Sequence, residues 1–200
     1  MPVISQRIKY QQMFAEGKIV NIGCGEDPAG FGEHAVHVDL DVYNHPNFVR
    51  ADAHNLPFKD DEFDTAILGD ILEHAEDPVK MLSEAGRVAK KVVATVYEEW
   101  RLRGDKEAQI QKFYSDEKKL GFDNHIDYLR SLPDFKDKIV EVIDDHVVSH
   151  HPHLHMFTED GLKEIIDKAG LEVIIFKKYQ EGEAEGRAVY NWLIVVQKKA

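Results

Sequence analysis

The chain has 200 residues, of which 43% are hydrophobic and 31% are charged. This length predicts one domain, and the composition excludes a largely disordered chain. Acidic residues outnumber basic ones by 37 to 25, which gives a net charge of −12. Because so negative a protein repels polyanions, we expect neither nucleic acid nor an anionic membrane surface to be its partner.

Cys24 is the only cysteine, which excludes an internal disulfide and a zinc site built from several cysteines. The N-terminal residues carry no apolar signal core. Nowhere does the chain contain the roughly 18 consecutive apolar residues of a membrane span. We therefore expect a soluble protein of the reducing cytoplasm.

Predicted strands and helices alternate along the chain. Residues 3–15 predict a weakly amphipathic helix. Short runs of β-branched and apolar residues then predict five strands, over residues 18–22, 35–40, 48–53, 63–68 and 92–97. Only about ten residues separate the first two strands and about eight the next two, so the helices between them must be short.

The two clearest helices have recognisable caps. Asp77 and Pro78 begin a helix between the fourth and fifth strands. Thr158 begins another, which Gly170 ends. A closing hairpin is predicted for residues 171–176 and 190–196, on either side of a Glu- and Gly-rich stretch over residues 180–187.

This order of elements predicts an α/β protein with a Rossmann-like, doubly wound sheet. The sheet should be mostly parallel, with an antiparallel C-terminal hairpin. A long, charged stretch follows the fifth strand, with helices expected around residues 105–120 and 124–131. An insertion at this point could cover a site as a lid.

A glycine turn follows the first strand, in the sequence Ile22-Gly23-Cys24-Gly25. A strand, a glycine turn and a helix start in succession let the backbone approach a ligand closely. A dinucleotide site would need a third glycine where Pro28 stands, and Glu26 and Asp27 would lie against the pyrophosphate. S-adenosylmethionine has no phosphate and carries a sulfonium and an ammonium, so an acidic turn suits it better.

Acidic residues end the second and third strands. Asp39, with Leu40 beside it, could accept hydrogen bonds from both hydroxyls of a ribose, and Asp41 is its near competitor. Asp52 could accept a hydrogen bond from an adenine amino group, with the small Ala53 against the ring.

A further candidate group, Gly69-Asp70-Ile71, follows the fourth strand. The ends of strands one to four should therefore meet at one edge of the sheet, where open α/β sheets bind ligands.

These stretches together resemble the class I S-adenosylmethionine-dependent methyltransferases, in particular the methyltransferase type 11 group. Its motifs recur here in order, as Leu-Pro-Phe, Phe-Asp and Leu-Glu-His at residues 56–58, 63–64 and 72–74. The resemblance implies that the backbone of residues 23–25 contacts the methionine part of S-adenosylmethionine. It also implies that Asp39 holds the ribose, Asp52 and Ala53 the adenine, and residues 69–71 the other face of the cofactor.

On this basis we divide the single domain into an N-terminal helix, a cofactor-binding core, an inserted lid with the acceptor region, and a C-terminal helix with its hairpin. These parts cover residues 1–17, 18–97, 98–155 and 156–200.

Five of the eleven histidines lie between residues 146 and 155. In an extended chain His151, His153 and His155 would share one face, which is a spacing found in metal ligands. An acceptor pocket lined by imidazole and aromatic groups is the interpretation we prefer, with a solvated loop as a further alternative. We expect no bound metal.

The sequence thus predicts an enzyme that moves the methyl group of S-adenosylmethionine to an oxygen or nitrogen of a small molecule. His155, His151 and Tyr97 are the candidates for a base that takes the acceptor's proton. An NAD- or nucleotide-sugar-binding oxidoreductase and a catalytically inactive S-adenosylmethionine-binding protein stay open as alternatives.

Overall fold

The computed structural model describes residues 5–26, 29–98, 155, 157–184 and 187–199. The described parts of residues 1–72, 77–98 and 157–200 belong to one compact unit, which contains the sheet. A second unit comprises residues 73–76 and 99–156, of which the structure describes 73–76 and 155.

Seven strands form one sheet in the order β3-β2-β1-β4-β5-β7-β6. The strands are β1 (Ile19–Ile22), β2 (Ala35–Asp39), β3 (Phe48–Arg50), β4 (Phe63–Gly69), β5 (Ala89–Tyr97), β6 (Leu171–Ala184) and β7 (Arg187–Lys198). The first five pair in parallel, whereas β7 runs antiparallel to both β5 and β6. The predicted doubly wound sheet with a C-terminal antiparallel hairpin is therefore confirmed.

The described helices are α1 (Gln6–Phe14), α2 (Pro78–Val88) and α6 (Glu159–Lys168), with 3-10 turns η1 (Gly32–His34) and η2 (Leu72–His74). Asp77 caps α2 by accepting the N–H of Lys80 at 2.9 Å, as its sequence position predicts. Thr158 caps α6 in the same way, through the N–H of Gly161 at 3.1 Å. Among the described residues, no helix is long and apolar enough to cross a membrane.

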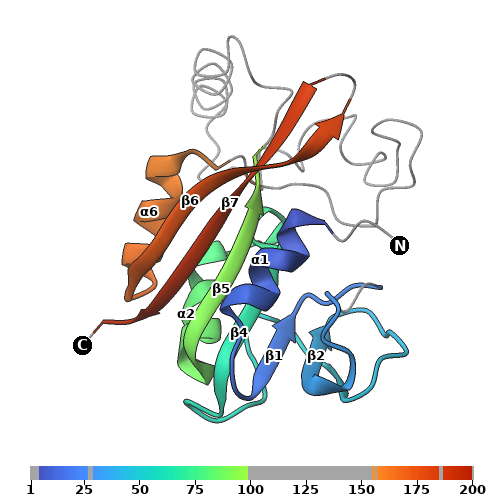
Figure 1. Cartoon of the computed structure of the whole chain (residues 1–200). Coiled ribbons are helices and arrows are strands. Elements are labelled where there is room, and N and C mark those ends of the chain that lie inside the picture. Colours follow the sequence, from blue (N-terminus) through green and yellow to red (C-terminus); the bar gives the residue numbers. More distant parts are fainter. Residues whose placement is uncertain (1–4, 27–28, 99–154, 156, 185–186, 200) are drawn as a thin grey trace, which may run out of the picture. The chain divides into compact units, whose positions relative to one another are not determined.

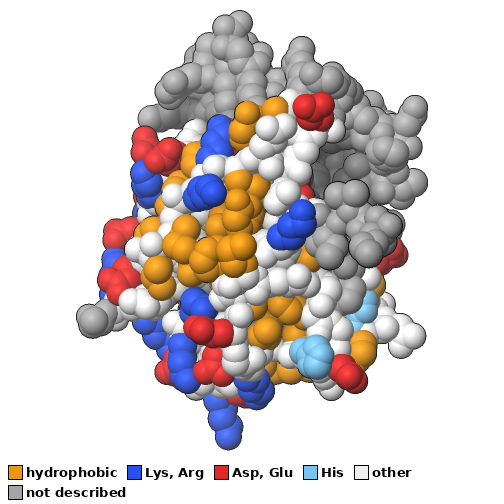
Figure 2. Space-filling model, in the orientation of Figure 1, with side chains coloured by type: hydrophobic (Ala, Val, Ile, Leu, Met, Phe, Trp, Pro, Cys, Tyr) orange, Lys and Arg blue, Asp and Glu red, His pale blue; other side chains and the backbone are white. Residues whose placement is uncertain are grey.

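The buried strands β1, β4 and β5 form the centre of the sheet, and both of their faces are covered. Figure 1 shows α1 crossing in front of β4 and β5, with α2 behind the sheet. The front face is covered by α1 and the short turn η1, because the connection from β1 to β2 has room for no more. Figure 2 shows apolar side chains between charged ones on this face, most of them over the hairpin of β6 and β7.

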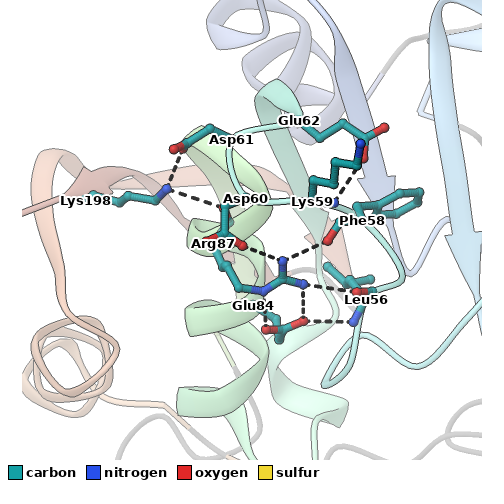
Figure 3. A network of polar contacts seen from close by, with 9 residues as sticks. All are labelled: Leu56, Phe58, Lys59, Asp60, Asp61, Glu62, Glu84, Arg87 and Lys198. Atoms are coloured by element: carbon teal, nitrogen blue, oxygen red, sulfur yellow. Dashed lines mark hydrogen bonds and ion pairs between the residues drawn. The ribbon is translucent and has the colours of Figure 1, made fainter.

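A polar network holds the connection from β3 to β4 against α2 (Figure 3). Arg87 of α2 forms a two-point ion pair with Glu84, at 2.7 and 2.8 Å. The same guanidinium donates to the carbonyls of Leu56 and Phe58 and to the carboxylate of Asp60, at 2.8 to 3.0 Å. One side chain thus provides donors to two loop carbonyls and pairs with a loop carboxylate.

The third strand, the fifth strand, which begins at Ala89, and both strands of the hairpin differ in length from the prediction. The third ends at Arg50 instead of continuing to residue 53, because the chain turns there into the loop that carries Asp52. The hairpin continues through the Glu- and Gly-rich stretch to Ala184 and resumes at Arg187. A shift in register at Gln180–Gly182 leaves Glu181 outside the ladder. The helices predicted around residues 105–120 and 124–131 lie outside the described residues.

Candidate functional site

The glycine turn after β1 has a backbone that only glycine adopts easily. Gly23 and Gly25 both have positive φ, +67° and +55°. The N–H groups of Gly23 and Cys24 donate to the carbonyl of Val38 in β2, at 2.8 and 3.1 Å. A Cβ on Gly23 would lie 1.8 Å from the Ile71 side chain, whereas a Cβ on Gly25 would meet nothing within 4 Å. The turn is therefore closed on one side by Ile71 and open at Gly25.

Asp39 directs its carboxylate to this turn. It accepts the N–H of Gly25 at 3.0 Å and the N–H of Asp41 at 3.1 Å. His45 holds the turn from another side, because its Nε2–H donates to the carbonyl of Gly25 at 2.7 Å. The side chain of Leu40 is 53% exposed. The sequence patterns gave no sign of the role of His45, since a single loop histidine belongs to no spacing pattern.

The electrostatic potential at the turn is negative. Burial, together with the charge of Asp39, raises the pKa of the Cys24 thiol to about 12. Burial and the charges of Asp39, Asp41 and Glu26 likewise raise the pKa of Tyr43. Two groups thus sense the same negative charges, and such a site favours a cationic ligand over a phosphate.

Asp52 follows β3, and its carboxylate is held in place by His54. It accepts the backbone N–H of His54 at 2.8 Å and its ring Nδ1–H at 2.7 Å. The backbone hydrogen bond is the main cause of the lowered pKa of Asp52, so this carboxylate is ionised at neutral pH. His54 Nε2 accepts the N–H of Asp77 at 3.3 Å, which links this loop to the start of α2. Ala53 is buried beside Asp52.

The segment after β4 lies next to the glycine turn. Ile22 and Leu68 are partners in the sheet, so Gly23 and Gly69 follow side by side. Asp70 adopts a left-handed backbone conformation with φ of +52°. Its two carboxylate oxygens accept hydrogen bonds from the amide nitrogen of the buried Asn191, at 3.0 and 3.1 Å. The predicted group at residues 69–71 is thus brought to the same edge as Asp39 and the turn.

The candidate bases are less completely defined. Tyr97 ends β5 opposite Asn191 of β7. His155 donates its backbone N–H to the carbonyl of Glu73 at 3.0 Å, and its ring Nε2 lies 2.9 Å from the carbonyl of Ala75. Because a carbonyl only accepts, Nε2 carries the proton. His151 lies outside the described residues, which contain no group of three His, Cys, Asp or Glu side chains suited to a metal.

Comparisons with known sequences point to one kind of domain. A family model described as a methyltransferase domain matches residues 29–94, which run from the end of the glycine turn into β5. An uncharacterised protein of Methanocaldococcus jannaschii is 36% identical over 88 residues. That match covers 41% of this chain and 43% of the relative, less than half of either.

Solved structures agree over nearly the whole length. A protein of Bacillus halodurans named as a methyltransferase superposes with a TM-score of 0.62 at 13% identity, covering 98% of this chain and 99% of that one. An S-adenosylmethionine-dependent methyltransferase of Methanosarcina mazei gives a TM-score of 0.59 at 18% identity, covering 94% and 95%. At such low identities the superpositions show a shared fold and nothing further. The chain therefore contains a segment that matches a methyltransferase domain, within a fold shared with S-adenosylmethionine-dependent methyltransferases.

The superpositions confirm the predicted fold, and the match to a methyltransferase domain agrees with the predicted cofactor, S-adenosylmethionine. The residues at the sheet edge fit that cofactor. Gly25 offers open space beside the backbone, Asp39 directs a carboxylate to the same place, and the negative potential suits a sulfonium.

Proposed function

We propose that this methyltransferase transfers the methyl group of S-adenosylmethionine to an oxygen or nitrogen of a small molecule. The observation that carries the proposal is the open glycine turn at Gly25, bounded by the carboxylate of Asp39 within a negative potential. The net charge of −12 supports a small acceptor over a nucleic acid. The lone cysteine, Cys24, supports action in the reducing cytoplasm.

The residues that would hold the cofactor line the carboxyl edge of β1 to β4. The backbone of Gly23, Cys24 and Gly25 would contact the methionine part. Asp39 would accept hydrogen bonds from the ribose hydroxyls, with Leu40 beside it. On the other face of the cofactor we place residues 69–71, because Ile71 already packs on Gly23.

Asp52 and Ala53 would bind the adenine. The fixed orientation of the Asp52 carboxylate supports this role, since a hydrogen bond to an amino group gains most when the acceptor is held in place before binding. The buried Ala53 offers a small apolar surface beside the ring.

When bound, S-adenosylmethionine supplies a methyl carbon already activated by a positive sulfur. The protein would therefore act mainly by alignment, and by taking a proton from the acceptor. His155, His151 and Tyr97 are the proposed bases. The contact of His155 Nε2 with the carbonyl of Ala75, at 2.9 Å, holds the ring in place.

The direct test is incubation of the protein with methyl-labelled S-adenosylmethionine and a panel of small alcohols, phenols and amines. We expect label in at least one small product, and replacement of His151 and His155 by alanine should reduce this turnover strongly. The affinity for S-adenosylhomocysteine, the demethylated product, should stay within about threefold. Loss of cofactor binding in the double variant would remove these histidines from the acceptor site.

A further inference from the structure

We infer that Arg7 of α1 binds the carboxylate at the methionine end of the cofactor. This inference rests on the proposed function and adds a residue that no motif of the sequence marks. It concerns one particular end of the ligand, the α-amino-acid group, which carries a carboxylate and an ammonium together.

Arg7 lies beside the glycine turn although it is distant in sequence. Its Nη1 donates to the carbonyl of Gly69 at 3.3 Å, and a Cβ added to Gly69 would lie 3.4 Å from the same nitrogen. Gly69 follows Leu68, whose partner in the sheet is Ile22, the residue before Gly23. The guanidinium therefore lies at the end of β4, the strand beside the one that leads into the turn.

The negative charges around the turn would repel the carboxylate of the cofactor unless a cation lay nearby. Glu26, Asp39 and Asp41 give this edge its negative potential, which favours the sulfonium and the ammonium but repels the carboxylate. A guanidinium next to the turn would offset that repulsion. Arginine is suited to the task because its planar group binds both oxygens of a carboxylate at once.

The present contacts of Arg7 leave it able to take a ligand. Its ion pair with Asp70 is long, at 3.7 Å, and the Arg7 side chain is 28% exposed. By contrast, the structural pair of Arg87 with Glu84 closes to 2.7 Å. The described contacts of the Arg7 guanidinium involve Nε and one N–H of Nη1, so we assign to the cofactor carboxylate a donor on Nη2 and the second donor on Nη1.

The surrounding residues hold Arg7 in position before any ligand binds. Its backbone N–H donates to Glu181 at 2.7 Å, the residue that the register shift of β6 places outside the ladder. One turn further along α1, the buried Gln11 donates to Thr95 of β5 at 3.1 Å. A helix fixed at both points presents the guanidinium at a set place, which limits the entropy lost on binding.

Two ligands that differ in one end allow this inference to be tested by titration calorimetry. S-adenosylhomocysteine contains the amino-acid end, whereas 5′-methylthioadenosine has the same adenine, ribose and thioether without it. Arg7→Met should weaken binding of S-adenosylhomocysteine about 10- to 100-fold, as expected for loss of a charge-assisted contact. Binding of 5′-methylthioadenosine should change by less than about threefold.

Lys9→Met is the matched control, because Lys9 is an exposed cation on the same helix. It should leave both affinities as in the wild type, and Arg7→Lys should restore part of the lost affinity. If Arg7→Met leaves the affinity for S-adenosylhomocysteine unchanged, or weakens both ligands equally, the inference is wrong while the proposed function stands. If the wild type binds neither ligand, the proposed function fails with it.

Discussion

The side chain of Asp39 serves the fold and the proposed site at once. It accepts two backbone N–H groups, and we propose that it also accepts hydrogen bonds from the ribose hydroxyls. Asp41 offers a second carboxylate two residues on, but it is exposed, and its N–H is itself a donor to Asp39. The structure therefore favours Asp39 for the ribose.

Replacement of the two carboxylates should separate their roles. We expect Asp39→Ala to weaken binding of S-adenosylhomocysteine about 10- to 100-fold, because charge-assisted hydrogen bonds are lost. Asp41→Ala should change it by less than about threefold. Calorimetry that gave the opposite ranking would transfer the ribose to Asp41.

Cys24 illustrates how the site changes the chemistry of one group. Its thiol is buried and its pKa is raised to about 12, so hardly any thiolate exists at neutral pH. We expect iodoacetamide at pH 8 to alkylate the folded protein very slowly and the urea-unfolded protein completely, as measured by intact mass. Equal rates in the two states would contradict the negative, buried environment assigned to the turn.

Among the elements, the connection from β3 to β4 depends most on a single residue. Arg87 makes hydrogen bonds to Glu84, to Asp60 and to two loop carbonyls (Figure 3). Its removal would leave the partly buried carboxylate of Glu84 without its cation and two loop carbonyls without this donor.

Arg87→Met should therefore lower the free energy of unfolding by about 2–3 kcal/mol, measured by urea denaturation. Arg87→Lys should recover only part of this, since an ammonium cannot reproduce the fork of donors. Lys90→Met is the control, because its pair with Asp64 is exposed and should contribute little to the free energy of unfolding. A loss of similar size in Lys90→Met would mean that loss of charge, not the network, is being measured.

The elements also show what the sequence allowed us to predict. The strands could be predicted from the sequence because runs such as Val92–Val96 are buried on both faces and need apolar residues throughout. Caps at Asp77 and Thr158 marked both helices. The length of the hairpin could not be predicted, because Glu and Gly residues ordinarily indicate a turn. In the structure, antiparallel pairing between β6 and β7 overrides that preference.

The sequence predicted those residues of the candidate site that a turn or a strand end requires. Glycines at positive φ, and carboxylates at strand ends, follow from the order of the elements. Arg7 and His45 reach the turn only through tertiary packing, since one comes from α1 and the other from the loop before β3. No spacing along the chain encodes such contacts.

At the scale of the whole molecule, one edge of the sheet collects the residues that give the protein its proposed activity. Parallel strands β1 to β4 end there together, so the glycine turn, Asp39, Asp52 and the segment after β4 are neighbours through topology alone. We propose that the acidic surroundings then discriminate between ligands that share adenosine. They should oppose the pyrophosphate of NAD and favour the sulfonium of S-adenosylmethionine.

This discrimination is the central claim, and a thermal unfolding experiment with matched ligands tests it most directly. A ligand that binds only the native state raises the melting temperature according to its concentration and affinity. We expect S-adenosylmethionine and S-adenosylhomocysteine each to raise the melting temperature of the wild-type protein, and NAD at the same concentration to leave it unchanged. A shift with NAD alone would contradict the account.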